Sequence, residues 1–275
     1  MLKAKNVIAG QFAYNHMSYT TNPESLSTRH IHDTYEILFV TAGEGRYLIE
    51  GREFRLSPRT LVLIKPFQYH CVEVDLSAGY ERHVLHFPQS FVLKEIEPML
   101  LRLTDSKDEE SGLFFAPEML TPAIVSLFDK FAETEALGEE EREIYCRLVL
   151  SELIILLCGQ GKEKILRYGD EIGAKVARYI NTYLDKNITL DEIASKFFLS
   201  KYYLCRMFKK YSGVSIHAYI NHKRVMYAKQ LIESGETASS AAYRVGFGDY
   251  SAFYRAYVKI VGRAPTSHER SFDEK

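Results

Sequence analysis

The pattern of apolar and polar positions changes about 120 residues into the chain. Before that point, apolar residues stand in short runs broken by glycine and proline. After it, they recur every three to four positions, as is typical of helices. Seven of the eight prolines lie between Pro23 and Pro122, so residues 123–264 can be almost wholly helical, because an interior proline costs a helix about 3 kcal/mol. We therefore expect a β-rich first part and a helical second part.

Six short apolar runs predict strands in the first part. They cover residues 35–41, 46–50, 53–56, 60–64, 71–74 and 82–87 and are rich in β-branched and aromatic residues. Turn-forming pairs such as Gly51-Arg52 and Ser57-Pro58 separate them. Strands this short and this evenly spaced favour a small antiparallel barrel or sandwich.

Two helices are expected to close this part, at residues 121–137 and 141–159. The first places apolar residues on one face. The second is apolar around much of its circumference, so it needs two packing partners. One of them is either a second subunit or another element of the same domain. The mostly polar residues 159–169, which include three glycines, follow as an interdomain segment.

The second part contains one pattern twice: a short helix, a tight turn and a longer helix. In the first unit, Thr189 and Glu192 form a capping box, and Ser200 caps a helix over 201–211. The second unit has a short helix over 239–245, and Asp249 opens the last major helix. A long helix over 216–234 is expected to set their separation. This is the arrangement of two helix-turn-helix units.

Composition and charge narrow the function. The chain has 46% hydrophobic and 26% charged residues, no run long enough for a signal peptide or membrane span, and four cysteines without a Cys-x-x-Cys pair. A cytoplasmic, globular protein is expected. Residues 165–275 hold 18 Lys and Arg against 11 Asp and Glu, whereas residues 1–164 hold 17 against 25. The basic second part is therefore the part expected to meet a polyanion, unless its charges are only a solvated surface.

Motifs along the second part lead to a family. The first unit has Thr189-Leu-Asp-Glu-Ile-Ala194, Ser200-x-x-Tyr203-Leu204-x-Arg206-x-Phe208-Lys-Lys210 and Gly213. The long helix that follows has Tyr219-x4-Arg224-x3-Ala228-x2-Leu231. The second unit has Val245-Gly-Phe247-x-Asp249, Phe253-x-Arg255 and Gly262-x2-Pro265. Residues from about 172 to 268 thus resemble the DNA-binding domain of AraC-type transcription regulators.

This resemblance implies which side chains meet double-stranded DNA. Base edges would be contacted by Tyr202, Cys205 and Arg206 of the first unit and by Tyr250, Ser251 and Arg255 of the second. Arginine can bond guanine with two hydrogen bonds, while tyrosine and serine make weaker contacts. Lys201, Lys209 and Lys210 would bind phosphates, which supplies affinity without sequence information.

The first part holds a second constellation: His30-x-His32-x3-Glu36-x6-Gly43, with His70 near a later strand. On a strand, His30 and His32 point to one face, and Glu36 is an even number of residues further on. Three imidazoles and a carboxylate suit Zn, Mn, Fe or Ni. The pattern resembles a cupin barrel, the sensor domain often joined to AraC-type DNA-binding domains.

Three roles for this cluster stay open: a divalent metal site, a small-molecule pocket and a purely structural network. The effector-binding residues would be His30, His32, Glu36 and His70 together with Tyr35, Arg46, Tyr47, His83 and His86. They suit a polar effector such as a sugar. By analogy with relatives, residues 11–21 are expected to form an N-terminal arm over the pocket.

The expected fold is therefore an all-β cupin-like barrel with flanking helices, followed by an all-α domain with two helix-turn-helix units. Its parts are an effector-binding barrel at 1–120, a helical dimerisation segment at 121–160, a linker at 161–171 and the DNA-binding domain at 172–271. The expected function is a ligand-responsive, homodimeric transcription regulator, of a family in which activation is the commoner mode, that controls uptake or metabolism of its effector. RNA polymerase is a further expected partner. The alternatives are a metal-dependent cupin enzyme with a fused helical module and a constitutive DNA-binding dimer.

Overall fold

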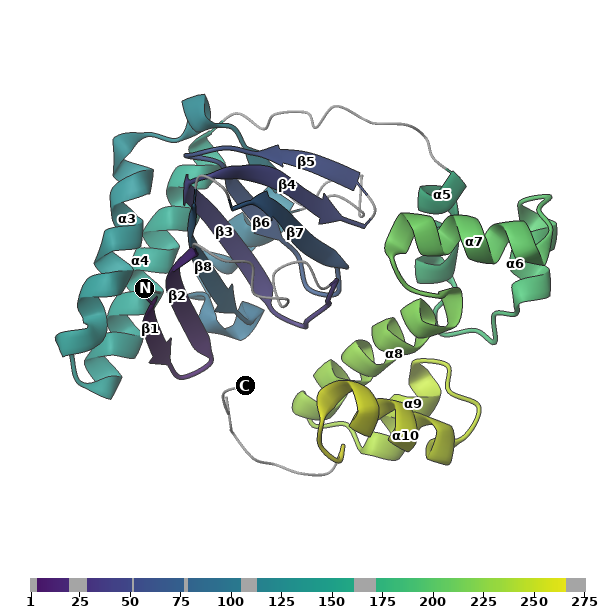
Figure 1. Cartoon of the computed structure of the whole chain (residues 1–275). Coiled ribbons are helices and arrows are strands. Elements are labelled where there is room, and N and C mark those ends of the chain that lie inside the picture. The colour runs from purple at the N-terminus through teal and green to yellow at the C-terminus, as the bar shows by residue number, and fades with distance from the viewer. Residues whose placement is uncertain are drawn as a thin grey trace. The chain divides into compact units, whose positions relative to one another are not determined.

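The computed structural model describes residues 4–19, 29–50, 52–76, 79–104, 113–160 and 172–265 (Figure 1). The chain divides into two compact units, Met1–Gly169 and Asp170–Lys275. The first contains two sheets and the helices that flank them, and the second is helical. The predicted fold class is confirmed. The predicted linker at 161–171 lies outside the described residues.

The first unit is built on nine described strands. A six-stranded antiparallel sheet has the order β1-β2-β8-β3-β6-β9, and a second, three-stranded sheet has the order β5-β4-β7. The bounds are β1 Ala4–Ala9, β2 Phe12–Tyr19, β3 Tyr35–Ala42, β4 Glu44–Ile49, β5 Arg52–Leu56, β6 Leu61–Ile64, β7 His70–Asp75, β8 Tyr80–Phe87 and β9 Leu113–Phe115. All six predicted strands are present, and β1, β2 and β9 were missed.

The predicted arm over residues 11–21 is wrong in its described part. Phe12–Tyr19 is strand β2, which pairs with β1 on one side and β8 on the other. The reason is packing: Phe12 and Tyr14, two residues apart, are fully buried in the core beneath the helices. Thr20 and Thr21 lie outside the described residues.

Helices cover one face of the six-stranded sheet (Figure 1). They are α2 Glu97–Thr104, α3 Pro122–Ala132 and α4 Glu139–Gly159, with short 3-10 turns η1 Gln89–Phe91, η2 Pro117–Met119 and η3 Glu133–Ala136. A core of apolar side chains fills the space between this sheet face and the helices, and a second core lies between the two sheets. Strand β3 serves both cores, because its alternate residues point to opposite faces: Ile37 and Phe39 lie in the first core, and Leu38 and Val40 in the second.

The second unit consists of α5 Ile172–Thr182, α6 Leu190–Lys196, α7 Lys201–Ser212, α8 Ile216–Glu233, α9 Ala238–Arg244 and α10 Tyr250–Val261. Helices α6–α7 and α9–α10 are the two helix-turn-helix units, and the 18-residue α8 connects them. The capping box of Thr189 and Glu192 is present, and Ser200 and Asp249 cap α7 and α10. No described helix has the length and apolar character needed to cross a membrane.

Candidate functional site

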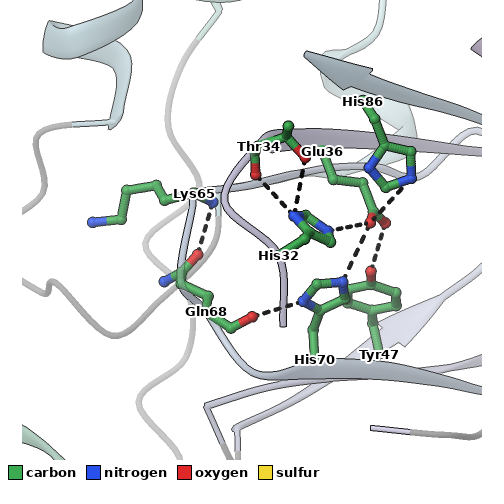
Figure 2. Close-up of polar contacts among 8 residues, drawn as sticks. All are labelled: His32, Thr34, Glu36, Tyr47, Lys65, Gln68, His70 and His86. Atoms are coloured by element: carbon green, nitrogen blue, oxygen red, sulfur yellow. Dashed lines mark hydrogen bonds and ion pairs between the residues drawn. The ribbon is translucent and has the colours of Figure 1, made fainter. Parts of the chain in front are cut away.

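A cluster of imidazoles surrounds one buried carboxylate in the first unit (Figure 2). Glu36 lies on β3 and is 3% exposed. Its Oε2 atom is 3.1 Å from Nε2 of His32, 3.2 Å from Nε2 of His70 and 3.8 Å from Nε2 of His86. These partners come from the loop before β3, from β7 and from β8. The cluster therefore depends on the packing of both sheets.

The other oxygen of this carboxylate, Oε1, accepts a hydrogen bond from a tyrosine. Tyr47 of β4 donates a hydrogen bond of 2.8 Å to Glu36 Oε1. Burial and the nearby Glu36 carboxylate raise the pKa of Tyr47 well above its ordinary value, so the hydroxyl keeps its proton. Tyr47 thereby orients the carboxylate with Oε2 facing the imidazoles.

Backbone carbonyls set the tautomers of two of these imidazoles. Nδ1 of His32 is 2.9 Å from the Thr34 carbonyl, and Nδ1 of His70 is 2.8 Å from the Gln68 carbonyl. A carbonyl only accepts, so each Nδ1 carries a hydrogen. In the neutral imidazoles, both Nε2 lone pairs then face Glu36 (Figure 2).

The charge of Glu36 follows from its neighbours. Burial raises the pKa of this carboxyl, but the imidazoles of His70, His32 and His86 outweigh burial and hold the pKa well below its ordinary range. The carboxylate is therefore ionised. The pKa of His86 falls to about 4, because burial outweighs the attraction of Glu36.

The four residues predicted to form a metal site do come together. One ligand atom each of His30, His32, Glu36 and His70 lies within 4.8 Å of the others. Nε2 of His70 is buried and makes no hydrogen bond to the described residues, although it lies at ion-pair distance from Glu36. His30 is exposed, so the cluster has one solvent-accessible side. The expected strand through His30 and His32 is wrong: His30 forms an isolated bridge with His70, and His32 lies in a loop.

Tyr35, Arg46 and His83 are not part of this cluster, contrary to prediction. Tyr35 stacks on Phe87 in the core beneath the helices. Arg46 is exposed and pairs with Glu53 and Glu73. His83 faces the helices, where its ring packs near Phe128. Each of the three is an odd number of residues from a cluster member on its own strand, and strand alternation places such residues on opposite faces.

Two polar residues beside the cluster, the buried Tyr80 and the half-buried Arg82, were not predicted from the sequence. Arg82 and Tyr80 lie on β8 at even spacing from His86, and the Tyr80 ring belongs to the core between the sheets. Burial raises the pKa of Tyr80, and the neighbouring Arg82 partly offsets this increase. The resulting pKa is about 12. The even spacing along residues 80–87 was the signal that would have identified them.

His83 provides a prediction for stability. Its Nδ1 is hydrogen-bonded to the Tyr14 hydroxyl at 2.8 Å, and burial, followed by nearby His16, lowers its pKa from 6.5 to about 3. The unfolded chain therefore binds a proton at His83 more readily than the folded chain does. The stabilisation that the neutral His83 contributes to the folded state is complete above pH 6.5 and is lost as the pH falls towards 3. Between pH 7 and pH 5 we expect a loss of about 2 kcal/mol in the free energy of unfolding.

Urea unfolding at the two pH values measures this loss. The variant His83→Gln keeps a polar partner for Tyr14 but does not titrate, so its stability should depend less on pH by that amount. An identical pH dependence in both proteins would show that His83 is not responsible.

The second unit presents its predicted DNA-contacting residues on α7 and α10. Tyr202 is 76% exposed, and Cys205, Arg206, Lys209 and Lys210 are also exposed. The Lys201 ammonium lies 2.8 Å from Asp191, an exposed pair of small energetic value that a phosphate can replace.

The two longer helices can be aligned through their caps. Both contain 12 residues between a side-chain cap and a glycine with positive φ, Gly213 at 82° and Gly262 at 81°. In this alignment Ser251 corresponds to Tyr202, and Arg255 to Arg206.

The same alignment places the predicted contact Tyr250 at the position of Lys201 and offers Tyr254 as a further candidate. Tyr250 corresponds to Lys201 and is half-buried, with its ring 5.7 Å from that of Phe253. Tyr254, which is 42% exposed, takes the place of Cys205.

Comparisons with known proteins cover both units. Residues 18–143 match the family model of the AraC-like ligand binding domain, and residues 193–271 match a helix-turn-helix domain. YfiF of Bacillus subtilis strain 168, an uncharacterised HTH-type transcriptional regulator, is 28% identical over 86% of this chain and 76% of its own length. The transcriptional activator RhaS of Klebsiella pneumoniae strain 342 is 24% identical over 84% and 83%.

Two further similarities are more limited. The regulatory protein PocR of Salmonella typhimurium is 31% identical, but over 36% of this chain and 33% of its own length. Among solved structures, ToxT from Vibrio cholerae O395 is 16% identical over 93% of this chain and 96% of its own, with a TM-score of 0.37.

Proposed function

This chain is an AraC-type transcription regulator with an N-terminal ligand-binding domain, and we propose from this that its barrel senses a ligand at Glu36 while α7 and α10 read a specific DNA sequence. Its relatives and its helix-turn-helix domain mark it as a transcriptional regulator and not an enzyme. The observation that carries the DNA-reading proposal is the repeat: two capped 12-residue helices expose an arginine at the same position, Arg206 and Arg255.

The roles within the DNA interface follow from side-chain chemistry. Arg206 and Arg255 can each bond a guanine edge with two hydrogen bonds, and Tyr202 and Ser251 add contacts near the helix N-termini, which enter the major groove in this motif. Phosphate contacts position the protein but carry no sequence information. We assign these to Lys201, Lys209 and Lys210.

Arg206→Ala and Lys209→Ala separate these roles. The probe is a duplex selected from a random pool by the wild-type protein, compared with an unselected duplex. Arg206→Ala should lower affinity for the selected duplex by about ten- to a hundredfold and relax preference at one or two base pairs. Lys209→Ala should weaken both duplexes alike and reduce the slope of log affinity against log salt by about 1.

Two outcomes would contradict this function. Equal losses on selected and unselected DNA for Arg206→Ala would remove that residue from sequence readout. Failure of the wild-type protein to enrich any sequence would contradict specific DNA binding itself.

For the ligand, the geometry supports a divalent transition metal better than a sugar. Two ligand atoms about 2.1 Å from one ion lie about 3.0 to 3.5 Å apart at bond angles of 90 to 110°. The separations of 3.1 and 3.2 Å from Glu36 Oε2 to His32 and His70 fall in this range. Two Nε2 lone pairs directed at a carboxylate repel it unless a proton or a metal ion lies between them.

The buried Nε2 atom of His70 supports the metal. It lies 3.2 Å from Glu36 Oε2 without an aligned hydrogen bond, and a bound ion would satisfy it. His32, His70, Glu36 and the exposed His30 would hold the ion, and the carbonyls of Thr34 and Gln68 would keep both imidazoles in the metal-binding tautomer. When bound, the ion would supply positive charge that cross-links the loop at His30 and His32 to β3 and β7.

A small polar effector such as a sugar is the second candidate, and the half-buried Arg82 and the buried Tyr80 favour it as hydrogen-bonding groups beside the cluster. In either case the ligand would alter the affinity for DNA.

We further propose that the protein is a homodimer joined through α4. It acts in the cytoplasm on RNA polymerase as an activator, and its target genes serve uptake or metabolism of the effector.

A further inference from the structure

The turn of the first helix-turn-helix unit places a phenylalanine where the backbone favours glycine. Phe198 has a φ of 55°, in the left-handed region that bulky residues rarely adopt. Its N–H donates to the Ser195 carbonyl, and the N–H of Leu199 donates to the Ala194 carbonyl. This pair of bonds is a Schellman cap, in which the left-handed residue is usually glycine.

The second helix-turn-helix unit has the same Schellman cap, with glycine in the left-handed position. Gly246 has a φ of 94°, its N–H donates to the Tyr243 carbonyl, and the next N–H donates to the Ala242 carbonyl. A Cβ atom there would lie 2.8 Å from the Asp185 carbonyl oxygen, so glycine is required. The first helix-turn-helix unit could use glycine equally well at this position of the cap but has Phe198 instead.

The Phe198 side chain gains little from folding within the helical unit. It is 96% exposed, the most exposed of the large hydrophobic residues in the described part of the chain. The exposure of the apolar ring and the left-handed backbone conformation are each unfavourable, and backbone strain of this kind is concentrated at functional sites. The position of the ring therefore points to a contact outside the helical unit.

The occupant follows from the neighbours of Phe198. It precedes Ser200, the N-cap of α7, by two residues, and the first turn of α7 exposes Tyr202 and Tyr203 at 76% and 52%. The N-terminal residues of a recognition helix contact base edges, so the preceding turn also comes close to the duplex.

We propose that Phe198 is a specificity-determining DNA contact that packs its ring against the C5-methyl group of a thymine. The inference rests on the proposed DNA-reading function. A phenyl ring cannot exchange hydrogen bonds with base edges, and the thymine methyl is the apolar group that the major groove offers. Phe198 thus adds an apolar contact to the hydrogen bonds of Arg206.

The test combines a protein change with a DNA change, using the full chain and the duplex that the wild-type protein selects. Each thymine is replaced in turn by deoxyuridine, which lacks only the methyl group. Wild-type affinity should fall about five- to tenfold at one or two positions in the half-site of α7. Phe198→Gly should show the same fall on unmodified DNA and no further fall at those positions. Phe198→Tyr keeps the ring and should keep the methyl dependence.

Stability provides a second readout, because Phe198→Gly relieves the backbone strain. Its melting temperature should rise while its affinity falls, which distinguishes a contact from misfolding. Two results would overturn the inference: wild-type affinity for the selected duplex in Phe198→Gly, or equal sensitivity of both proteins to every deoxyuridine. If the wild-type protein selects no duplex at all, the DNA-reading function fails first, and the inference fails with it.

Discussion

Replacing Leu148 by glutamate should convert a dimer into a monomer and lower affinity for a two-half-site duplex by at least about a hundredfold. Helix α4 packs one face into the core through Val149, Leu153 and other apolar residues. Its opposite face carries Ile144, Leu148 and Ile155, which are 53%, 54% and 45% exposed. These three residues recur at helical spacing and form a single stripe.

A second copy of the chain is the partner we propose for this stripe. A two-fold dimer would place the stripe of one α4 against that of the other, so each buries the same surface. Glutamate at position 148 would then put two like charges in an apolar interface. Loss of the dimer removes the high effective concentration of the second DNA-binding unit, which accounts for the large fall in DNA affinity.

Sedimentation velocity at micromolar concentration measures the oligomeric state, and titration of the selected duplex measures the affinity. Ser126→Glu on α3 adds the same charge at another exposed helical position, so it should remain dimeric and bind normally. Since Leu148 is already exposed, its replacement should change folding stability by no more than about 0.5 kcal/mol. A monomeric wild-type protein, or a dimeric Leu148→Glu variant, would contradict the assignment.

Glu36→Gln should lower the affinity for Zn²⁺ or Ni²⁺ by at least about a hundredfold. The substitution preserves the shape of the side chain and an oxygen that can accept from Tyr47, but it removes the charge that the ion would neutralise. His70→Gln removes one imidazole and should have a comparable effect, because the remaining three groups no longer enclose the ion.

Calorimetric titration measures these affinities, and elemental analysis should find one ion per wild-type chain. His83→Gln is the matched control, because it removes an equally buried imidazole from the opposite face of β8. Metal should also change the affinity of the wild-type protein, but not of Glu36→Gln, for the selected duplex. Undiminished binding by Glu36→Gln, or no binding by the wild-type protein, would contradict the metal site, and stabilisation by a sugar in its place would favour the second candidate.

The helical unit shows how much of the fold local sequence can predict. Its helices begin at side chains that cap them, such as Ser200 and Asp249, and α7 and α10 end at glycines with positive φ. These are interactions among residues close in sequence, so the boundaries of α7, α8 and α9 could be predicted to within one residue.

The first unit shows where such prediction failed. Strands β1 and β2 were missed because Phe12–Tyr19 mixes polar and apolar residues that only pairing with β8 explains. Helix α2 was missed because it carries Pro98, which is tolerated in the first turn of a helix. The odd positions of Tyr35, Arg46 and His83 could have been excluded from strand alternation alone.

By itself, the sequence determined the two-part architecture, the repeated helix-turn-helix units and the residue types of the Glu36 cluster, because periodicity, capping and motif spacing are local properties. Only the tertiary structure showed how Tyr47, His70 and His86, from three different strands, are placed around the two oxygens of Glu36. It also decided that Phe198 is exposed in a left-handed conformation and that one face of α4 is left uncovered within its unit. Exposure and long-range contact depend on how distant segments pack, and no local pattern carries that information.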